Sequence, residues 1–190
     1  MNIRAILLAA GSGSRFGGDK LLARLPDGVP VGVAAWRNLK TAVEQSVAVV
    51  RSADTELREL LRSEGARVIE CADAQAGMSR SLIAGLEATS DSDGWIIALG
   101  DMPYINPETI RTIANAIEDG ALIAMPTHRG QRGHPVGLSR RLLAELLDVK
   151  GDEGARTVVR RHAGECELVA CEDDPGVLRD IDTRDDLAGA

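Results

Sequence analysis

A short apolar run that breaks into a loop of small residues and two cations constrains this chain most. The run, residues 3–10, is expected to form a buried strand. The loop that follows, residues 11–18, holds four glycines and two serines, so its backbone can turn tightly and approach a ligand closely. Exposed backbone N–H groups in such a loop suit phosphate oxygens, and Arg15 and Lys20 add two positive charges. The stretch therefore predicts a polyphosphate-binding site after the first strand.

Other glycine-rich phosphate loops do not fit this pattern. A Walker A loop ends in Gly-Lys-Ser/Thr, whereas Lys20 is followed by Leu21. The dinucleotide fingerprint requires Gly-x-Gly-x-x-Gly, whereas Gly11, Gly13 and Gly17 have a longer final spacing. The Val-Ala-Ile-Lys strand of protein kinases is absent. An ordinary glycine-rich turn remains as an alternative, but such a turn does not require cations at fixed offsets.

Length and composition restrict the class of protein. The 190 residues are expected to form a single domain, 1–190, large enough to bury a hydrophobic core. The net charge of −7 and the aromatic content of 2% argue against a nucleic-acid partner, which usually needs a basic face or stacking platforms. No apolar run is long enough to span a bilayer, and the first is too short for a signal peptide. A cytoplasmic protein without a membrane partner is expected.

The cysteines and histidines give weaker signals. The three cysteines, Cys71, Cys166 and Cys171, are odd in number and have no Cys-x-x-Cys spacing. Reduced thiols are therefore favoured over a zinc site or a disulfide. His128 and His162 are expected at the surface.

Strands and helices are expected to alternate along the chain. The predicted strands are 3–10, 46–50, 67–71, 95–99, 121–125, 135–138 and 167–170, with a polar loop at 127–134. The predicted helices are 31–44, 54–62, 77–88, one that begins at Asn106, 139–147, 153–162 and 185–188. Several strands are apolar throughout, which is typical of a mostly parallel sheet covered by helices on both faces. The fold class predicted is therefore α/β and Rossmann-like, with ligands bound beyond the carboxyl ends of the strands.

A carboxylate is predicted at the same edge of the sheet as the glycine-rich loop. Asp101 follows the apolar strand 95–99, where it could bind the Mg²⁺ that accompanies a triphosphate. Asp180 and Asp182 are candidates for a second ligand, and alternation puts both on the same side of an extended segment, so spacing cannot choose between them. Asp101 could instead serve in a turn, and Asp182 could cap the last helix.

Several motifs in order along the chain carry a resemblance to a known family. They are Leu8-Ala9-Ala10-Gly11-Ser12-Gly13-Ser14-Arg15-Phe16-Gly17 with Lys20, Gly77-Met78-Ser79-Arg80-Ser81-Leu82, Leu99-Gly100-Asp101-Met102-Pro103, Gly133-His134-Pro135-Val136, Gly151-Asp152-Glu153-Gly154-Ala155-Arg156 and Asp180-Ile181-Asp182-Thr183. With these motifs the chain resembles the MobA/MocA-like nucleotidyltransferases of the GT-A type, and it is most similar to the molybdenum cofactor cytidylyltransferase branch. It departs from them at Gly28-Val29-Pro30-Val31-Gly32, where the family usually has Gly-x-Pro-Leu-Leu.

The resemblance implies a role for each matching residue. Arg15 would hold the β- and γ-phosphates, Lys20 the α-phosphate, and Asp101 and Asp182 would bind Mg²⁺, or Mn²⁺ in its place. The residues implied in nucleotide binding are Ala9, Ala10, Gly11, Gly13, Gly77, Ser79 and Ser81. His134 and Arg156 would lie on the acceptor side. The Ala-Ala-Gly sequence favours CTP over GTP, because GTP users tend to have Ala-Gly-Gly.

The resemblance implies transfer of CMP from CTP to the phosphate of molybdopterin, with release of pyrophosphate. A phosphomonoester acceptor is largely dianionic near neutral pH, since its second pKa is about 6, and so needs no general base. The alternatives are an NTP transferase for another phosphorylated acceptor, a GTP-using enzyme, and a nucleotide-binding module without turnover. A molybdoenzyme that receives the product would be a further partner.

Overall fold

The computed structural model of this protein describes residues 1–11 and 16–188. The predictions made for Gly13 and Arg15 therefore lie outside the described residues. Within the described ranges, most elements agree with those expected from the sequence pattern. The helix expected at 139–147 is instead a 3-10 helix, Arg140–Leu142, followed by a short α-helix, Leu143–Leu147, and the helix expected at 153–162 spans only Arg156–Arg161.

Eight strands of the described chain form one mixed sheet, ordered β3-β2-β1-β4-β7-β5-β6, with β8 paired to β5. The parallel half consists of β1 (Ile3–Ala9), β2 (Ser46–Arg51), β3 (Arg67–Cys71) and β4 (Gly94–Leu99). The other half consists of β5 (Ile123–His128), β6 (Gln131–Arg132), β7 (Val136–Ser139) and β8 (Cys166–Ala170). Strand β7 is antiparallel to both β4 and β5, whereas β8 is parallel to β5.

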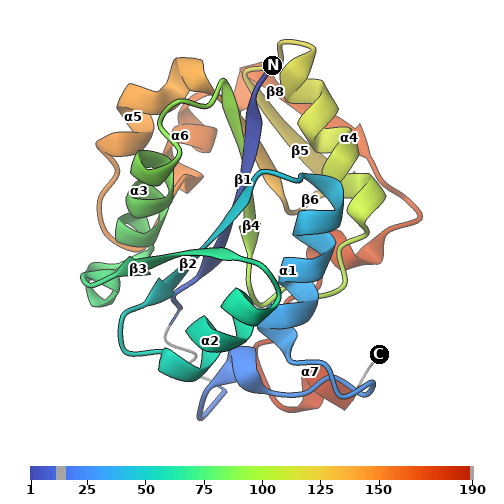
Figure 1. Ribbon diagram of the computed structural model, residues 1–190. Helices are drawn as coiled ribbons and strands as arrows, with labels where there is room; N and C mark the ends of the chain where they lie inside the picture. The colour runs from blue at the N-terminus through green and yellow to red at the C-terminus, as the bar shows by residue number, and fades with distance from the viewer. Residues whose placement is uncertain (12–15, 189–190) are drawn as a thin grey trace.

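Helices cover both faces of this sheet (Figure 1). One face carries α1 (Val31–Ala42), α2 (Thr55–Ser63) and α4 (Pro107–Glu118), and the other carries α3 (Met78–Ala88), α5 (Leu143–Leu147) and α6 (Arg156–Arg161). Short 3-10 helices occur at η1 (Lys20–Leu22), η2 (Ala74–Ala76), η3 (Arg140–Leu142), η4 (Ala163–Glu165) and η5 (Pro175–Leu178). The last helix, α7 (Asp185–Ala188), packs through Leu187 against a small cluster formed by Phe16, Leu25, Val31 and Ile181. The predicted α/β class with a mostly parallel sheet is confirmed.

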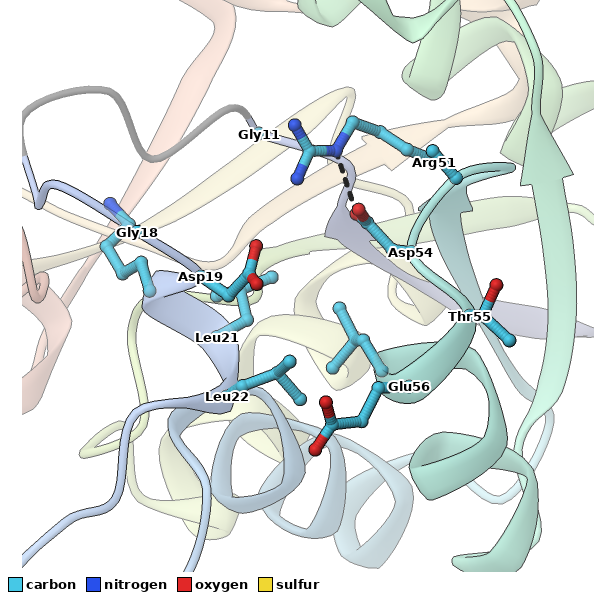
Figure 2. Close-up of a pocket in the computed structure, with 12 residues that line it drawn as sticks. Gly11, Gly18, Asp19, Leu21, Leu22, Arg51, Asp54, Thr55 and Glu56 are labelled. Atoms are coloured by element: carbon cyan, nitrogen blue, oxygen red, sulfur yellow. Dashed lines mark hydrogen bonds and ion pairs between the residues drawn. The ribbon is translucent and has the colours of Figure 1, made fainter.

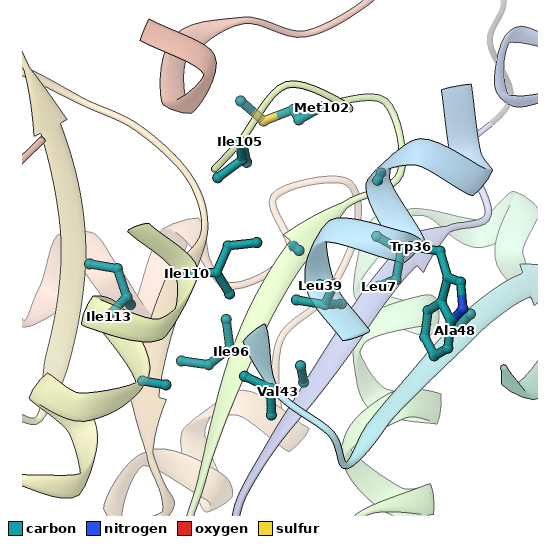
Figure 3. Packing of buried hydrophobic residues seen from close by; sticks show 14 of the residues in the cluster. Leu7, Trp36, Leu39, Val43, Ala48, Ile96, Met102, Ile105, Ile110 and Ile113 are labelled. Carbon is teal, nitrogen blue, oxygen red and sulfur yellow. The ribbon is translucent and has the colours of Figure 1, made fainter. Parts of the chain in front are cut away.

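The apolar strands bury side chains on both sides, which explains their lack of polar residues. In β1, Leu7 belongs to the core under α1 and α4, while its neighbour Ile6 belongs to the core under α3. Figure 3 shows the first core, in which Trp36 and Leu39 of α1 pack toward the sheet. Because successive side chains of a strand point to opposite faces, a strand covered twice must be apolar at every position.

The segment predicted as a polar loop at 127–134 contains more structure than its composition indicates. Strand β5 continues to His128, and β6 pairs with it as a hairpin. His128 is 8% exposed, and its Nδ1 lies 3.2 Å from the backbone oxygen of Cys171. The prediction that His128 lies at the surface was therefore wrong: the residue belongs to a paired strand, and its ring reaches the backbone of Cys171, just after β8.

No helix of the described chain is both long and apolar enough to cross a membrane.

Leu39 provides a test of the core between α1 and the sheet. It is 0% exposed, so replacement by alanine should lower the free energy of unfolding by about 2–5 kcal/mol. Leu147, at the end of α5, is 39% exposed, and its alanine variant should lose about 1 kcal/mol or less. Urea unfolding followed by circular dichroism measures both; equal losses would contradict the packing described.

Candidate active site

A lysine and two aspartates from distant parts of the sequence meet beyond the carboxyl ends of the parallel strands. The Nζ atom of Lys20, in η1, lies 2.8 Å from Oδ2 of Asp101, which follows β4. The same Nζ lies 3.2 Å from Oδ1 of Asp182, near the end of the chain. These pairs join residues 81 and 162 positions apart. The sequence predicted this convergence of Lys20 with Asp101 from the common edge of parallel strands.

Asp180 completes a group of three carboxylates. One carboxylate oxygen from each of Asp101, Asp180 and Asp182 lies within 4.8 Å of the others. Burial, and then the charge of Asp182, raise the pKa of the Asp180 carboxyl above its ordinary value. The structure brings to this group both Asp180 and Asp182, between which sequence spacing left the choice open.

Ile181, the residue between Asp180 and Asp182, explains how these two aspartates are arranged. Ile181 is 0% exposed and packs with Phe16, Leu25 and Val31. Its backbone N–H donates a hydrogen bond of 2.9 Å to the backbone oxygen of Asp101. This anchor holds the chain on either side of Ile181 against the end of β4.

Lys20 is held as a cation within this group. Its side chain is only 12% exposed, and burial by itself would lower the pKa of the ammonium group. The hydrogen bonds and charges of Asp101 and Asp182 outweigh this effect, and the net result is a raised pKa. Lys20 therefore stays protonated, as a charge partner of acids should.

The predicted nucleotide-binding residues lie along the end of β1 and the start of α3. Ala9 and Ala10 are buried, and Gly11 is exposed. Ser79 and Ser81 are 2% and 4% exposed, so little of either residue is open to solvent. Gly77 precedes them with a φ of +119°, a conformation that side-chain-bearing residues rarely adopt.

The motif at Gly77 contacts the motif at Gly151, a juxtaposition that the sequence did not reveal. The backbone N–H of Ser79 donates a hydrogen bond of 3.1 Å to the backbone oxygen of Gly151. A Cβ atom added to Gly77 would lie 2.5 Å from that oxygen and 2.8 Å from Oδ1 of Asp152. The loop at 151–156, which ends at Arg156 of the predicted acceptor side, thus packs directly against the predicted nucleotide side.

His134 lies within the electrostatic reach of both Asp101 and Arg156. Its backbone N–H donates to the backbone oxygen of Val177, and a Cβ on the preceding Gly133 would lie 2.3 Å from that oxygen. The His134 Nδ1 atom is buried and has no hydrogen-bond partner among the described residues. Burial lowers the pKa of this imidazole to about 4, with Asp101 opposing and Arg156 assisting. His134 is therefore neutral at physiological pH, whereas the exposed Arg156 carries a charge.

A cavity of about 240 Å³ lies beside Lys20, and sequence reasoning missed it (Figure 2). It is bounded by 18–22 on one side and by the end of β2 and the start of α2 on the other. Asp54 immediately precedes α2, but its side chain makes no capping hydrogen bond to the described backbone of that helix. Instead, Oδ2 of Asp54 accepts a hydrogen bond of 2.8 Å from Nε of Arg51. The sequence signal that could have indicated this cavity was the pair of opposite charges, Arg51 and Asp54, at the end of a buried strand.

A Rossmann-like sheet with a glycine-rich loop and paired carboxylates at the strand ends defines an α/β protein that handles nucleotides. Residues 5–166 match the family described as the MobA-like NTP transferase domain. The chain therefore belongs to the MobA-like NTP transferases and is a nucleotidyltransferase by family, as its motifs predicted.

Several known proteins are similar to this chain over half or more of their length. Nicotine blue oxidoreductase of Paenarthrobacter nicotinovorans is 28% identical over 189 residues, covering 95% of this chain and 92% of that protein. A probable molybdenum cofactor guanylyltransferase of Thermococcus kodakarensis is 35% identical over 113 residues, which cover 60% of this chain and 53% of that protein. The crystal structure of Rv0371c from Mycobacterium tuberculosis H37Rv in complex with manganese superposes with a TM-score of 0.83, with 26% identity and 100% of both chains covered.

The histidines provide a test of the electrostatics around the site. Because burial disfavours its charged form, the His134 imidazole should stay neutral until the pH falls to about 4. His162, held between Glu165 and Glu145 with distances of 2.9 Å to each, should instead take up its proton above its ordinary pKa of 6.5. Two-dimensional NMR of the imidazole C–H groups measures both values, with His134→Gln and His162→Gln for assignment. Titration of His134 near pH 6.5 would contradict the effect ascribed to the burial of its ring.

Proposed function

We propose that this NTP transferase moves CMP from CTP to the phosphate of a molybdopterin-type acceptor, releasing pyrophosphate, with Mg²⁺ as its metal. The observation that carries the proposal is the cluster of Lys20, Asp101 and Asp182 at the strand ends. Such a cluster offers a cation for phosphate and carboxylates for a metal in one place. The probable molybdenum cofactor guanylyltransferase among the relatives supports this class of acceptor.

The three carboxylates fit a divalent metal. Mg²⁺ and Mn²⁺ both take oxygen ligands, and the group supplies one oxygen from each of three aspartates within 4.8 Å of one another. Asp101 and Asp182 would hold the ion, with Asp180 beside them. When bound, the metal would neutralise phosphate charge and polarise the α-phosphate. The manganese complex of a 26%-identical relative supports a divalent ion in this fold.

The rest of the proposed mechanism depends on positioning and charge. Lys20 would contact the α-phosphate once a nucleotide is bound, and Arg15, outside the described residues, would hold the departing pyrophosphate. An acceptor phosphate oxygen would attack the α-phosphate as the bond to pyrophosphate breaks. No proton has to be removed from a dianionic acceptor, so the mechanism needs no general base, and the lowered pKa of the His134 imidazole makes it a weak one. The chain's contribution is then orientation and stabilisation of the charge that develops.

The two sides of the site would select the two substrates. The backbone of Ala9, Ala10 and Gly11 would face the base and sugar, together with Gly77, Ser79 and Ser81, and the Ala-Ala-Gly sequence favours CTP. On the acceptor side, the exposed guanidinium of Arg156 suits a phosphate, because its fork of N–H donors can bind two phosphate oxygens. The contact between Ser79 and Gly151 would couple the two sides.

The name of one nearly full-length relative raises an oxidoreductase as a second candidate. The residues of this chain favour phosphate transfer. Gly11, Gly13 and Gly17 lack the spacing that a dinucleotide cofactor requires. An ammonium group paired with two carboxylates, with a third carboxylate beside them, suits a metal and a polyphosphate rather than the transfer of a hydride.

Asp101 provides the direct test of the metal and phosphate site. Asp101→Asn should lower the rate of Mg²⁺-dependent pyrophosphate release by about 10²–10³, the typical cost of removing a group that stabilises the transition state. Asp148→Asn is the matched control, because the Asp148 side chain is 85% exposed. Coupled detection of pyrophosphate measures the rate; equal activity of the two variants would refute the role of Asp101.

The substrates are tested with the wild-type protein. CTP, GTP, ATP and UTP are each incubated with Mg²⁺ and purified molybdopterin, and pyrophosphate and the dinucleotide product are measured. Product from CTP at the highest rate is the expected result. Preference for GTP would overturn the choice of base, and product only with a sugar phosphate or alcohol phosphate would overturn the choice of acceptor.

A further inference from the structure

The Lys20 ammonium group lies where a cation is needed most. It contacts an oxygen of Asp101 at 2.8 Å and one of Asp182 at 3.2 Å, and Asp180 belongs to the same group of acids. The exposed fractions of the three interacting side chains are 12%, 24% and 30%, so solvent screens this cluster only in part. The lysine thus neutralises carboxylates that would otherwise repel one another at short range.

We infer that Lys20 stands in for the metal before a nucleotide binds, and that it keeps free divalent metal off Asp101 and Asp182 until the nucleotide arrives. This inference rests on the proposed function, because that proposal identifies these aspartates as the metal ligands. It adds that metal and nucleotide bind together, because the same lysine controls both events.

Competition follows from geometry and charge. The oxygens that Lys20 contacts are carboxylate oxygens, the ligands that Mg²⁺ and Mn²⁺ require. A divalent ion between Asp101 and Asp182 would lie within a few ångströms of the Lys20 ammonium group. In a partly buried site, the ion and the ammonium group would repel each other strongly. The metal therefore has to displace the lysine from at least one aspartate, and its affinity for the free protein is reduced by that cost.

A nucleotide would remove this obstacle. Its phosphates offer the ammonium group another anion, while the metal that accompanies them takes over the carboxylates. The exchange leaves every charge partnered: the ammonium pairs with phosphate, and the aspartates pair with metal. Metal and nucleotide then bind with positive coupling, since each favours the arrangement that the other needs.

The loss of this competition can be measured without turnover. In the absence of nucleotide, Lys20→Met should bind Mn²⁺ roughly tenfold or more tightly than the wild-type protein, because a competing positive charge is gone. Free Mn²⁺ is followed by electron paramagnetic resonance during a titration. Lys40→Met is the matched control, because it changes the net charge of the protein by the same amount. Lys40 is exposed on α1, where its ammonium group donates to the backbone oxygen of Glu64 rather than to the aspartates. Its Mn²⁺ affinity should equal that of the wild-type protein.

A second substitution identifies the site. Asp101→Asn introduced into Lys20→Met should abolish the gain in affinity, which places the added ion on the carboxylates described here. Lys20→Gln repeats the test with a polar side chain, and circular dichroism establishes that each variant is folded. A folded Lys20→Met or Lys20→Gln protein that binds Mn²⁺ no more tightly than the wild-type protein overturns the inference, as does an equal gain in Lys40→Met.

The outcomes separate this inference from the proposed function. Tighter Mn²⁺ binding by Lys20→Met supports the stand-in role even where the wild-type protein transfers no CMP. Transfer of CMP by the wild-type protein with no gain in Mn²⁺ affinity in Lys20→Met supports the enzyme and refutes the stand-in role.

Discussion

The ion pairs between Lys20 and two aspartates are the interaction on which the site depends. They connect the segment after β1, the end of β4 and the last part of the chain at distances of 2.8 and 3.2 Å. Like charges so close together are unfavourable without a cation among them, and partial burial strengthens both the repulsion and its relief. The fold therefore brings carboxylates from two distant segments together and supplies, in Lys20, the positive charge that makes their approach possible.

Hydrophobic packing determines where these charges lie. Strands β1 and β4 are neighbours with side chains buried on both faces, so their ends are fixed relative to one another. Ile181 contributes the third fixed point, since it is fully buried between charged neighbours and bonds to the backbone of Asp101. A site built on such elements is more rigid than one built on loops alone, as catalysis by positioning requires.

The same framework can serve different substrates. Family membership and a shared fold establish a nucleotidyltransferase framework, while the names of the relatives differ. In this chain, we propose that substrate selection lies in the segments around the strand ends: the end of β1, the start of α3, and the loop at 151–156. The hydrogen bond from the Ser79 backbone N–H to the Gly151 backbone oxygen joins two of them. Function therefore has to be argued from the site rather than from the fold.

The amino-acid sequence by itself determined the alternation of strands and helices, the buried parallel strands, and the placement of Lys20 and Asp101 at one edge of the sheet. These features follow from local patterns, namely hydrophobic periodicity and the rule that parallel strands end together. Only the tertiary structure decided that Asp180 and Asp182 both join the group, that Gly77 packs on Gly151, and that His128 is buried. These facts depend on contacts between segments far apart in the chain, and local patterns contain no information about such distances.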